Sequence, residues 1–150
     1  MKQSVLGDRR EYFRHGNEEF PCASYLDYYN ESAYPWHWHD ELEAAFVQKG
    51  KAAVFIDGKQ YILGEGEGFL VNRRVLHASS AGARGDVFLP NILFLPSLLY
   101  GTQESVFWKK YMEPLLLAPE FSHVILRKEE GWQTQMLERM REAFEIMTQE

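Results

Sequence analysis

Two histidines separated by one residue, His37 and His39, are the sequence feature that most constrains the fold of this chain. Side chains alternate along a β-strand, so both histidines share one face of an extended segment. Glu43 falls on the same face when the alternation continues, and His77 follows on a later predicted strand. A fold that brings these four side chains together encloses a polar pocket between strands.

The chemistry of these four residues predicts a ligand-binding cluster that is competent to hold a metal. Imidazole and carboxylate groups suit zinc, iron, nickel or manganese, and three or four converging ligands are the usual number. In the alternative interpretation, the same groups are hydrogen-bond partners of a polar ligand or of one another. The predicted cluster consists of His37, His39, Glu43 and His77.

Lys49 is a fifth candidate for ligand binding. If no bulge shifts the register, the alternation that carries Glu43 inward also carries Val47 and Lys49 inward. A buried lysine needs a polar partner, and Lys49 would meet a hydroxyl or carboxylate group of a bound molecule. In the alternative, its side chain extends outward and keeps the ammonium group in water.

The composition predicts one globular domain. The 150 residues are 45% hydrophobic and 25% charged, with 15% aromatic residues. These proportions allow a buried core, and the aromatic side chains suit strands and pocket walls. The formal net charge of −6 disfavours a chain that binds nucleic acid phosphates by itself.

Features of secretion and membrane insertion are missing from the sequence. The first ten residues are charged and lack the apolar region of a signal peptide. The longest apolar patches, residues 88–95 and 115–118, are too short to span a bilayer. The single cysteine, Cys22, excludes an internal disulfide and fits a reducing compartment. We therefore expect a cytoplasmic protein without a membrane partner.

Short extended segments with a turn about every ten residues predict a small barrel or sandwich, in a mainly β fold. The strongest turn signal is the hairpin dipeptide Asp57-Gly58. The predicted strands cover residues 20–30, 34–39, 41–48, 51–56, 59–63, 69–73, 75–79, 86–95 and 121–127.

Helical spacing appears after Pro96. It predicts a helical turn at residues 97–101 and a short helix at about 103–112, which Pro114 would stop. A longer helix over residues 129–149 has an apolar stripe that either packs on the sheet or forms a homodimer interface. The stripe consists of Trp132, Met136, Met140, Phe144 and Met147, widened by Leu137 and Ala143.

These patterns divide the chain into three parts. Residues 1–19 form a polar N-terminal arm that either packs through Tyr12 and Phe13 or is loosely ordered. Residues 20–127 form the barrel with the short helix, and residues 128–150 form a C-terminal dimerisation helix. Because the chain ends directly after this helix, we expect it to be a fragment of a longer protein.

The sequence names no catalytic residue. Cys22 lies upstream of the pocket, and nothing marks a base beside it. Ser79 and Ser80 lie close to His77, in a position typical of a strand end. These patterns indicate a binding domain rather than an enzyme.

At the histidine motif the chain resembles the cupin superfamily, which implies a double-stranded β-helix, or jelly-roll, barrel. The first cupin motif is a glycine, five residues, His-x-His, three or four residues, a glutamate, six residues and a glycine. The matching residues are His37, His39, Glu43 and Gly50, while Glu31 stands in place of the opening glycine.

The second cupin motif is only partly kept. Its pattern is a glycine, five residues, Pro-x-Gly, two residues, a histidine, three residues and an asparagine. Gly66 and His77 match, whereas Asn72, Arg74 and Ala81 replace the proline, the second glycine and the asparagine. In the superfamily the three histidines and the glutamate are metal ligands, and all four positions are present here.

A narrower resemblance, to the sensor domain of AraC-family transcriptional regulators, covers nearly the whole chain from Phe20 onward. In that family the barrel binds a small effector, often a sugar, and the following helices mediate dimerisation. A separate C-terminal domain with two helix-turn-helix units binds DNA. The segments that carry the resemblance are residues 37–43, 57–58, 76–77, 92–101 and 110–115.

We therefore expect an effector-sensing and dimerisation domain of an AraC-type regulator, which contacts DNA only through a domain outside this chain. A homodimer would form through the terminal helix, and a divalent metal is a possible cofactor. The alternatives are a metal-dependent cupin enzyme, such as a dioxygenase or sugar isomerase, and a purely structural dimerisation module. The expected effector-binding residues are His37, His39, Glu43, Lys49 and His77.

Overall fold

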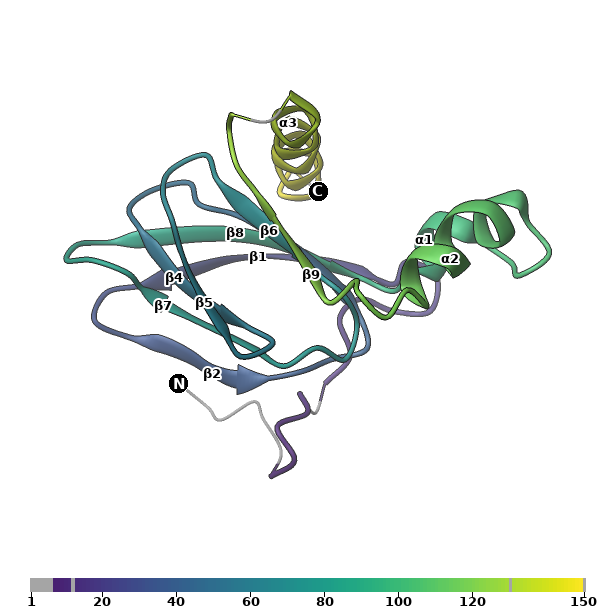
Figure 1. The fold of residues 1–150 in the computed structure, drawn as a ribbon, viewed down its shortest axis with the longest axis horizontal. Helices are drawn as coiled ribbons and strands as arrows, with labels where there is room; N and C mark the ends of the chain where they lie inside the picture. The colour runs from purple at the N-terminus through teal and green to yellow at the C-terminus, as the bar shows by residue number, and fades with distance from the viewer. Residues whose placement is uncertain (1–6, 12, 130, 150) are drawn as a thin grey trace.

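Two antiparallel sheets face each other and form a barrel, with the helices outside it (Figure 1). The computed structural model describes residues 7–11, 13–129 and 131–149. The predicted β-barrel is confirmed, and every predicted strand overlaps an observed one. Within the described residues, one sheet has the order β1 (Cys22–Tyr29), β8 (Val87–Phe94), β3 (Leu42–Phe46), β6 (Gly68–Val71), β9 (His123–Leu126), and the other has the order β2 (Ala33–His37), β7 (His77–Ala81), β4 (Ala52–Ile56), β5 (Lys59–Leu63).

The predicted hairpin connects β4 and β5. Asp57 and Gly58 both adopt positive φ, 50° and 77°, as a two-residue type I′ turn requires. The turn pairs Ile56 with Lys59 and keeps the register to the far end of both strands. Strand β4 also pairs with β7, so the hairpin fixes the position of the strand that begins with His77.

The inner faces of the two sheets meet in the main hydrophobic core. Tight packing of such side chains is the largest favourable contribution to folding. The polar cavity described below lies beside this core, and Phe69 belongs to both. The core residues are Tyr29, Ala45, Val47, Ala52, Val54, Ile56, Leu63, Phe69, Val71, Val87 and Leu89.

Helix α3 (Gly131–Met147) lies across the outer face of the five-stranded sheet (Figure 1). Leu137, Met140 and Phe144 are buried there, and the ring of Phe144 meets that of Phe46 edge-on at 6.1 Å. Packing on the sheet is therefore one confirmed use of the predicted apolar stripe. Trp132, at the start of the stripe, is instead exposed.

A second helical group, α1 (Ser97–Tyr100), η1 (Phe107–Met112) and α2 (Glu113–Leu116), projects from one end of the barrel (Figure 1). Met112 and Leu116 anchor it against Leu42. The prediction that Pro114 stops the helix is wrong. Pro114 lies in the first turn of α2, after a π-helical segment in which the N–H of Glu113 reaches back to the carbonyl of Trp108. This wider turn accommodates the proline ring.

The described part of the N-terminal arm is attached to the segment that follows β2. The N–H of Glu11 donates to the carbonyl of Trp38, and the N–H of Trp38 donates to the carbonyl of Arg9. The expectations for residues 1–6 and Tyr12 lie outside the described residues. Of the two aromatic residues predicted to pack, Phe13 contacts the ring of His15.

None of the helices in the described part of the chain is both long and apolar enough to cross a membrane.

Candidate metal centre and ligand cavity

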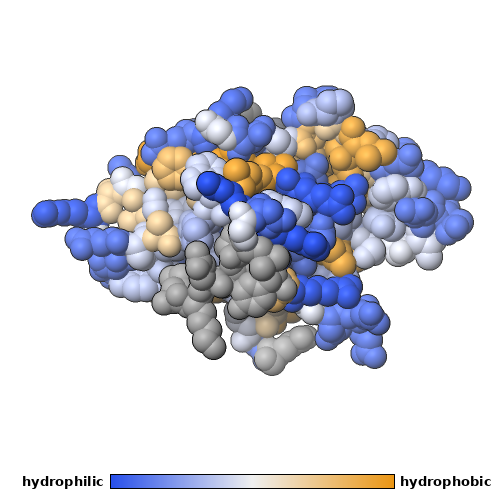
Figure 2. Space-filling model, turned by 90° about the horizontal axis from the view of Figure 1, so that it is seen from below, coloured by the Kyte–Doolittle hydropathy of each residue, from blue (hydrophilic) through white to orange (hydrophobic). Residues whose placement is uncertain are grey.

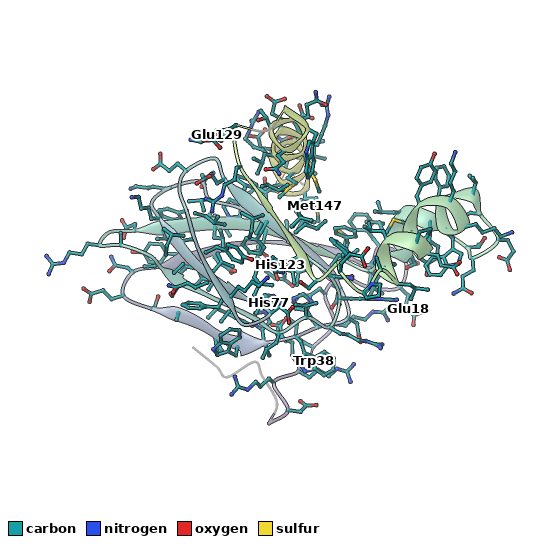
Figure 3. The ribbon with its side chains drawn as sticks, viewed as in Figure 1. Glu18, Trp38, His77, His123, Glu129 and Met147 are labelled. Carbon is teal, nitrogen blue, oxygen red and sulfur yellow. The ribbon has the colours of Figure 1, made fainter. Side chains whose placement is uncertain are left out.

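The four predicted side chains converge inside the barrel. His37, the last residue of β2, is in register with His77, the first residue of β7. Glu43 comes from β3 in the opposite sheet, and His39 from the segment between the sheets. All four are buried, and their ligand atoms lie within 4.8 Å of one another. Figure 3 shows His77 in the interior, between the two sheets.

The convergence does not come from alternation along one strand, as the sequence suggested. Strand β2 ends at His37, and the chain crosses to the other sheet before β3 begins at Leu42. Within this crossing, Glu41 is buried beside His39: one carboxylate oxygen accepts the N–H of His15 at 3.1 Å, and the other lies 3.9 Å from Nδ1 of His39. The crossing lets residues only a few positions apart face one another across the barrel.

Backbone carbonyls orient the three imidazoles. A carbonyl oxygen only accepts hydrogen bonds, so each ring nitrogen beside one carries a proton. In a neutral ring the other nitrogen, Nε2, then holds a lone pair. The Nδ1–carbonyl pairs are His37 with Pro35 at 2.8 Å, His39 with Glu41 at 3.0 Å and His77 with Val75 at 2.8 Å.

The Nε2 atoms of two rings approach one carboxylate oxygen. Nε2 of His39 lies 3.1 Å, and Nε2 of His77 2.9 Å, from Oε2 of Glu43. A lone pair on each nitrogen would repel the carboxylate, so the arrangement requires either protons on the Nε2 atoms or a cation between the groups. The cluster is therefore built to hold positive charge.

The pKa shifts follow from burial and from these contacts. Burial acts to raise the pKa of Glu43, but the hydrogen bonds from His39 and His77 outweigh it and hold the pKa well below its usual range. Burial acts to lower the pKa of His39, and Glu43 outweighs it, so the pKa is raised. For His37, burial and the neighbouring His77 lower the pKa to about 4. Glu43 is thus ionised and His37 neutral near pH 7.

The donor set fits a divalent metal. Three imidazole nitrogens and one carboxylate oxygen are the number and kind of ligands that zinc, nickel, iron and manganese take. The Nδ1–carbonyl hydrogen bonds are the outer contacts that usually fix the tautomer of metal-binding histidines. A divalent ion would take the place of the protons that the Nε2 atoms otherwise need.

A cavity of 160 Å³ adjoins the cluster. Its walls combine aromatic rings with hydrogen-bonding groups, as is typical of small-molecule sites. The lining residues are Glu11, Phe13, His15, Tyr25, Asp27, Tyr34, His37, Glu43, Phe69, His77, Ala78, Ser79, Asn91 and Leu93.

The N-terminal arm supplies two buried polar residues that the sequence did not reveal, Glu11 and His15. Oε1 of Glu11 lies 3.0 Å from Nε2 of His15 and 4.0 Å from Nε2 of His39. The hydroxyl of Tyr34 donates to the other Glu11 oxygen, and that of Tyr25 lies 2.8 Å from Nδ1 of His15. The available signal was a glutamate and a histidine four residues apart, within a segment that otherwise resembles a surface arm.

Lys49 does not reach the cluster. Strand β3 ends at Phe46, so the alternation that predicted an inward lysine no longer applies. Lys49 is exposed, its backbone pairs with Phe88, and its Nζ lies 5.9 Å from the centre of the Phe88 ring. The structure thus agrees with the alternative in which the side chain extends outward.

The altered second motif still places His77 correctly. Arg74, where the cupin pattern has glycine, adopts a φ of 61°. Its N–H donates to the carbonyl of His39 at 2.7 Å, and its guanidinium donates to Asp40 at 2.8 Å. Asn72, where the pattern has proline, is buried and donates to the carbonyl of Phe121. These contacts hold the turn and tie it to the His39 segment.

Comparison with known families agrees with this architecture. Residues 22–130 match the family described as the AraC-like ligand binding domain. This chain belongs to that family. The match covers both sheets and ends at the start of α3.

A curated relative of this chain is described as a transcriptional regulator. The uncharacterized HTH-type transcriptional regulator YdeC of Bacillus subtilis (strain 168) is 22% identical over 153 residues. The alignment covers 99% of this chain and 52% of the relative. The chain therefore spans about half the length of the curated relative that it matches.

The likeness to one solved structure, a cupin domain, shows the cupin fold of this chain. The Cnp3 cupin domain of Schizosaccharomyces pombe has a TM-score of 0.50 and 14% identity, and covers 55% of this chain and 61% of that chain. The DMSP lyase DddQ of Ruegeria pomeroyi DSS-3 has a TM-score of 0.46 and 22% identity, over 50% of this chain and 39% of that chain. The predicted cupin barrel is confirmed.

Replacement of Tyr34 by phenylalanine tests the attachment of the arm. Burial acts to raise the pKa of Glu11, but the hydrogen bonds with His15 and Tyr34 outweigh it and lower the pKa. Tyr34→Phe removes one donor from a buried carboxylate, so we expect a loss of about 1–3 kcal/mol in the free energy of unfolding at pH 7. Urea denaturation measures it.

Tyr28→Phe is the matched control for this measurement. This variant also removes a hydroxyl that donates to a carboxylate. The carboxylate belongs to Asp86, and the contact lies at an exposed site. We expect its unfolding midpoint to equal that of the wild type. Equal midpoints for Tyr34→Phe and Tyr28→Phe would show that the contact of Tyr34 with Glu11 does not stabilise the fold.

Proposed function

We propose that this chain is the small-molecule sensing and dimerisation domain of an AraC-type transcription regulator. The observation that carries the proposal is a polar cavity of 160 Å³ inside a domain of the AraC-like ligand-binding family. Three of the four metal-competent side chains, His37, Glu43 and His77, line the cavity, and the N-terminal arm forms part of its wall. The proposed effector-binding residues are His37, His39, Glu43 and His77.

The proposal includes a divalent metal at the cluster, with zinc, nickel, iron and manganese as candidates. The Nε2 atoms of the three histidines and a carboxylate oxygen of Glu43 would hold it. When bound, the ion supplies a positive charge that attracts hydroxyl or carbonyl oxygens. The backbone carbonyls keep the rings in the required tautomer, and all four side chains are buried.

Two elements are placed to transmit the presence of an effector. The arm lines the cavity through Glu11, while its neighbour Arg10 pairs with Asp40 at 3.2 Å on the outside. Strand β3 presents Glu43 to the cavity and Phe46 to α3. An effector that binds one arrangement of the arm or of α3 more tightly shifts the population toward that arrangement.

The proposed partners are the effector, a second copy of the chain and DNA. Trp132 and Ile146 on α3 are 57% and 64% exposed and provide apolar contacts for a homodimer. DNA would be contacted by a separate helix-turn-helix domain, in agreement with the description of the relative as an HTH-type regulator. A transcription regulator must be in the same compartment as the DNA that it binds. The proposal therefore includes a cytoplasmic location.

The second candidate function is a metal-dependent cupin enzyme of the dioxygenase or sugar isomerase type. The observation that favours it is the complete set of three imidazoles and one carboxylate. The two functions differ in the fate of the bound molecule, because an enzyme converts its substrate whereas a sensor releases its effector unchanged. NMR spectra of a bound molecule before and after incubation with metal-loaded protein distinguish them.

Metal content tests the cluster. We expect protein purified without chelator to contain about one divalent ion per chain. Inductively coupled plasma mass spectrometry measures this content. His77→Ala removes one of four ligands, so we expect its metal content to fall about tenfold or more after dialysis. His123→Ala removes a histidine whose ring contacts Tyr61 and Ser122 instead, and it is expected to keep the metal.

Two results would contradict the metal proposal. Wild-type protein that stays metal-free after incubation with each of the four ions would exclude a metal centre. Full metal content in His77→Ala would place the ion elsewhere in the molecule.

Sedimentation tests dimerisation through α3. The wild-type chain is expected to be a dimer at micromolar concentration. We expect Trp132→Ala/Ile146→Ala to weaken the dimer by about tenfold or more, because large apolar side chains dominate such interfaces. The control Glu138→Ala/Glu145→Ala changes exposed residues on another side of the same helix and is expected to leave the dimer intact. A wild-type monomer at high micromolar concentration would contradict this part of the proposal.

A further inference from the structure

The charges that line the cavity constrain what it binds. Among the described lining residues there are three carboxylates, Glu11, Asp27 and Glu43, and neither a lysine nor an arginine. The histidines of the cluster compensate the negative charge of Glu43. The carboxylate of Glu11 is contacted by His15 and Tyr34. Asp27 has no basic side chain beside it among the lining residues.

Asp27 and Asn91 together form an acceptor-rich wall. Asp27 lies on β1 and Asn91 on the neighbouring strand β8. The Asn91 amide donates to a carboxylate oxygen of Asp27 at 2.9 Å and to the carbonyl of Leu89 at 3.1 Å. Both amide hydrogens are thus in use, so the atoms that this pair offers to a ligand are acceptors.

The electrostatic setting of Asp27 agrees with this description. Burial, followed by the negative charge of Glu43, raises the pKa of Asp27 to about 6. A carboxylate in such a position is stabilised by a ligand that donates a hydrogen bond or carries positive charge. Beside Asp27, a ligand carboxylate or phosphate would instead add a second negative charge to a buried position.

The size of the cavity limits the ligand further. A cavity of about 150 Å³ holds a molecule as small as benzene, and this cavity has a volume of 160 Å³. The part of the ligand that this cavity holds is therefore about the size of benzene, with roughly six non-hydrogen atoms. The rings of Phe13, Tyr25, Tyr34 and Phe69 provide apolar walls.

We propose that the effector is a small molecule without negative charge that places a hydroxyl or ammonium donor on Asp27. Asp27 is then the residue that determines specificity against anionic molecules, at a site apart from the four-residue cluster. The inference rests on the proposed sensing function, and it adds the chemical class of the effector.

Three matched probes test the proposal. Glycerol, 3-amino-1,2-propanediol and glycerate share a three-carbon skeleton and differ at one end, which carries a hydroxyl, an ammonium or a carboxylate group. Binding to the wild-type chain, with and without zinc, is measured by titration calorimetry and by the shift in Tm. We expect at least one donor probe to bind about tenfold more tightly than glycerate.

The variant Asp27→Asn keeps the size of the side chain and removes its charge. We expect it to reduce the preference over glycerate to about twofold or less. Asp86→Asn is the matched control, since Asp86 also accepts hydrogen bonds from neighbouring side chains but does not line the cavity. It is expected to keep the wild-type preference. If Asp27→Asn does not fold, the order of affinities of the three probes for the wild-type chain tests the proposal by itself.

Each outcome supports the proposal or overturns it. Tighter binding of the amine than of glycerol identifies a cationic effector, and equal binding identifies a neutral polyol. Three results overturn the proposal. Glycerate binds as tightly as the donor probes, or neither donor probe shows saturable binding, or a folded Asp27→Asn variant keeps the wild-type preference. The proposed function is judged separately, because a monomer with the expected preference contradicts dimerisation and leaves the specificity of the cavity intact.

Discussion

The buried carboxylate of Glu43 is the constraint on which the rest of the structure depends. An ionised group inside a barrel is stable only when positive charge or several hydrogen bonds compensate it. Here the compensation comes from His77, at the start of β7 in the sheet opposite Glu43, and from His39 in the crossing between the sheets. Strand register and the position of one charge are therefore coupled, and a shift of either sheet would leave the carboxylate without partners.

The polar surroundings of the cluster extend this dependence to the arm. Glu11 and His15 reach the cavity wall through hydrogen bonds to Tyr34 and Tyr25. On the outside, Arg10 and Arg74 both pair with Asp40, so the arm and the turn before His77 share one carboxylate. Figure 2 shows strongly hydrophilic residues gathered on this face of the molecule. The ligand cavity, the arm and the turn thus form one connected unit.

The sequence predicted the fold because the fold depends on local patterns. It also predicted the members of the cluster, although the crossing between the sheets, and not alternation along one strand, brings them together. Strand alternation, the Asp57-Gly58 turn and the spacing from His37 to Glu43 are visible without any tertiary information. Lys49 was misplaced as a site residue because its predicted direction assumed a strand that continues beyond Phe46. Local patterns gave no sign of where that strand ends.

The other residues of the cavity were not predictable in this way. Glu11 and Asp27 belong to the wall only because the arm crosses Trp38 and β1 pairs with β8. Pro114 was taken as a helix end because the rule applies to α-helical turns, and the preceding turn is π-helical. In each case a long-range contact or an uncommon local geometry decided the outcome.

Backbone carbonyls fix His37, His39 and His77 in one tautomer, and the Nε2 atoms of His39 and His77 face Glu43. Long-range ¹⁵N–¹H NMR of the histidine rings in zinc-loaded protein tests this arrangement most directly. We predict that all three rings carry a proton on Nδ1 and none on Nε2. A proton on Nε2 of any of these rings in the zinc-loaded protein would contradict it.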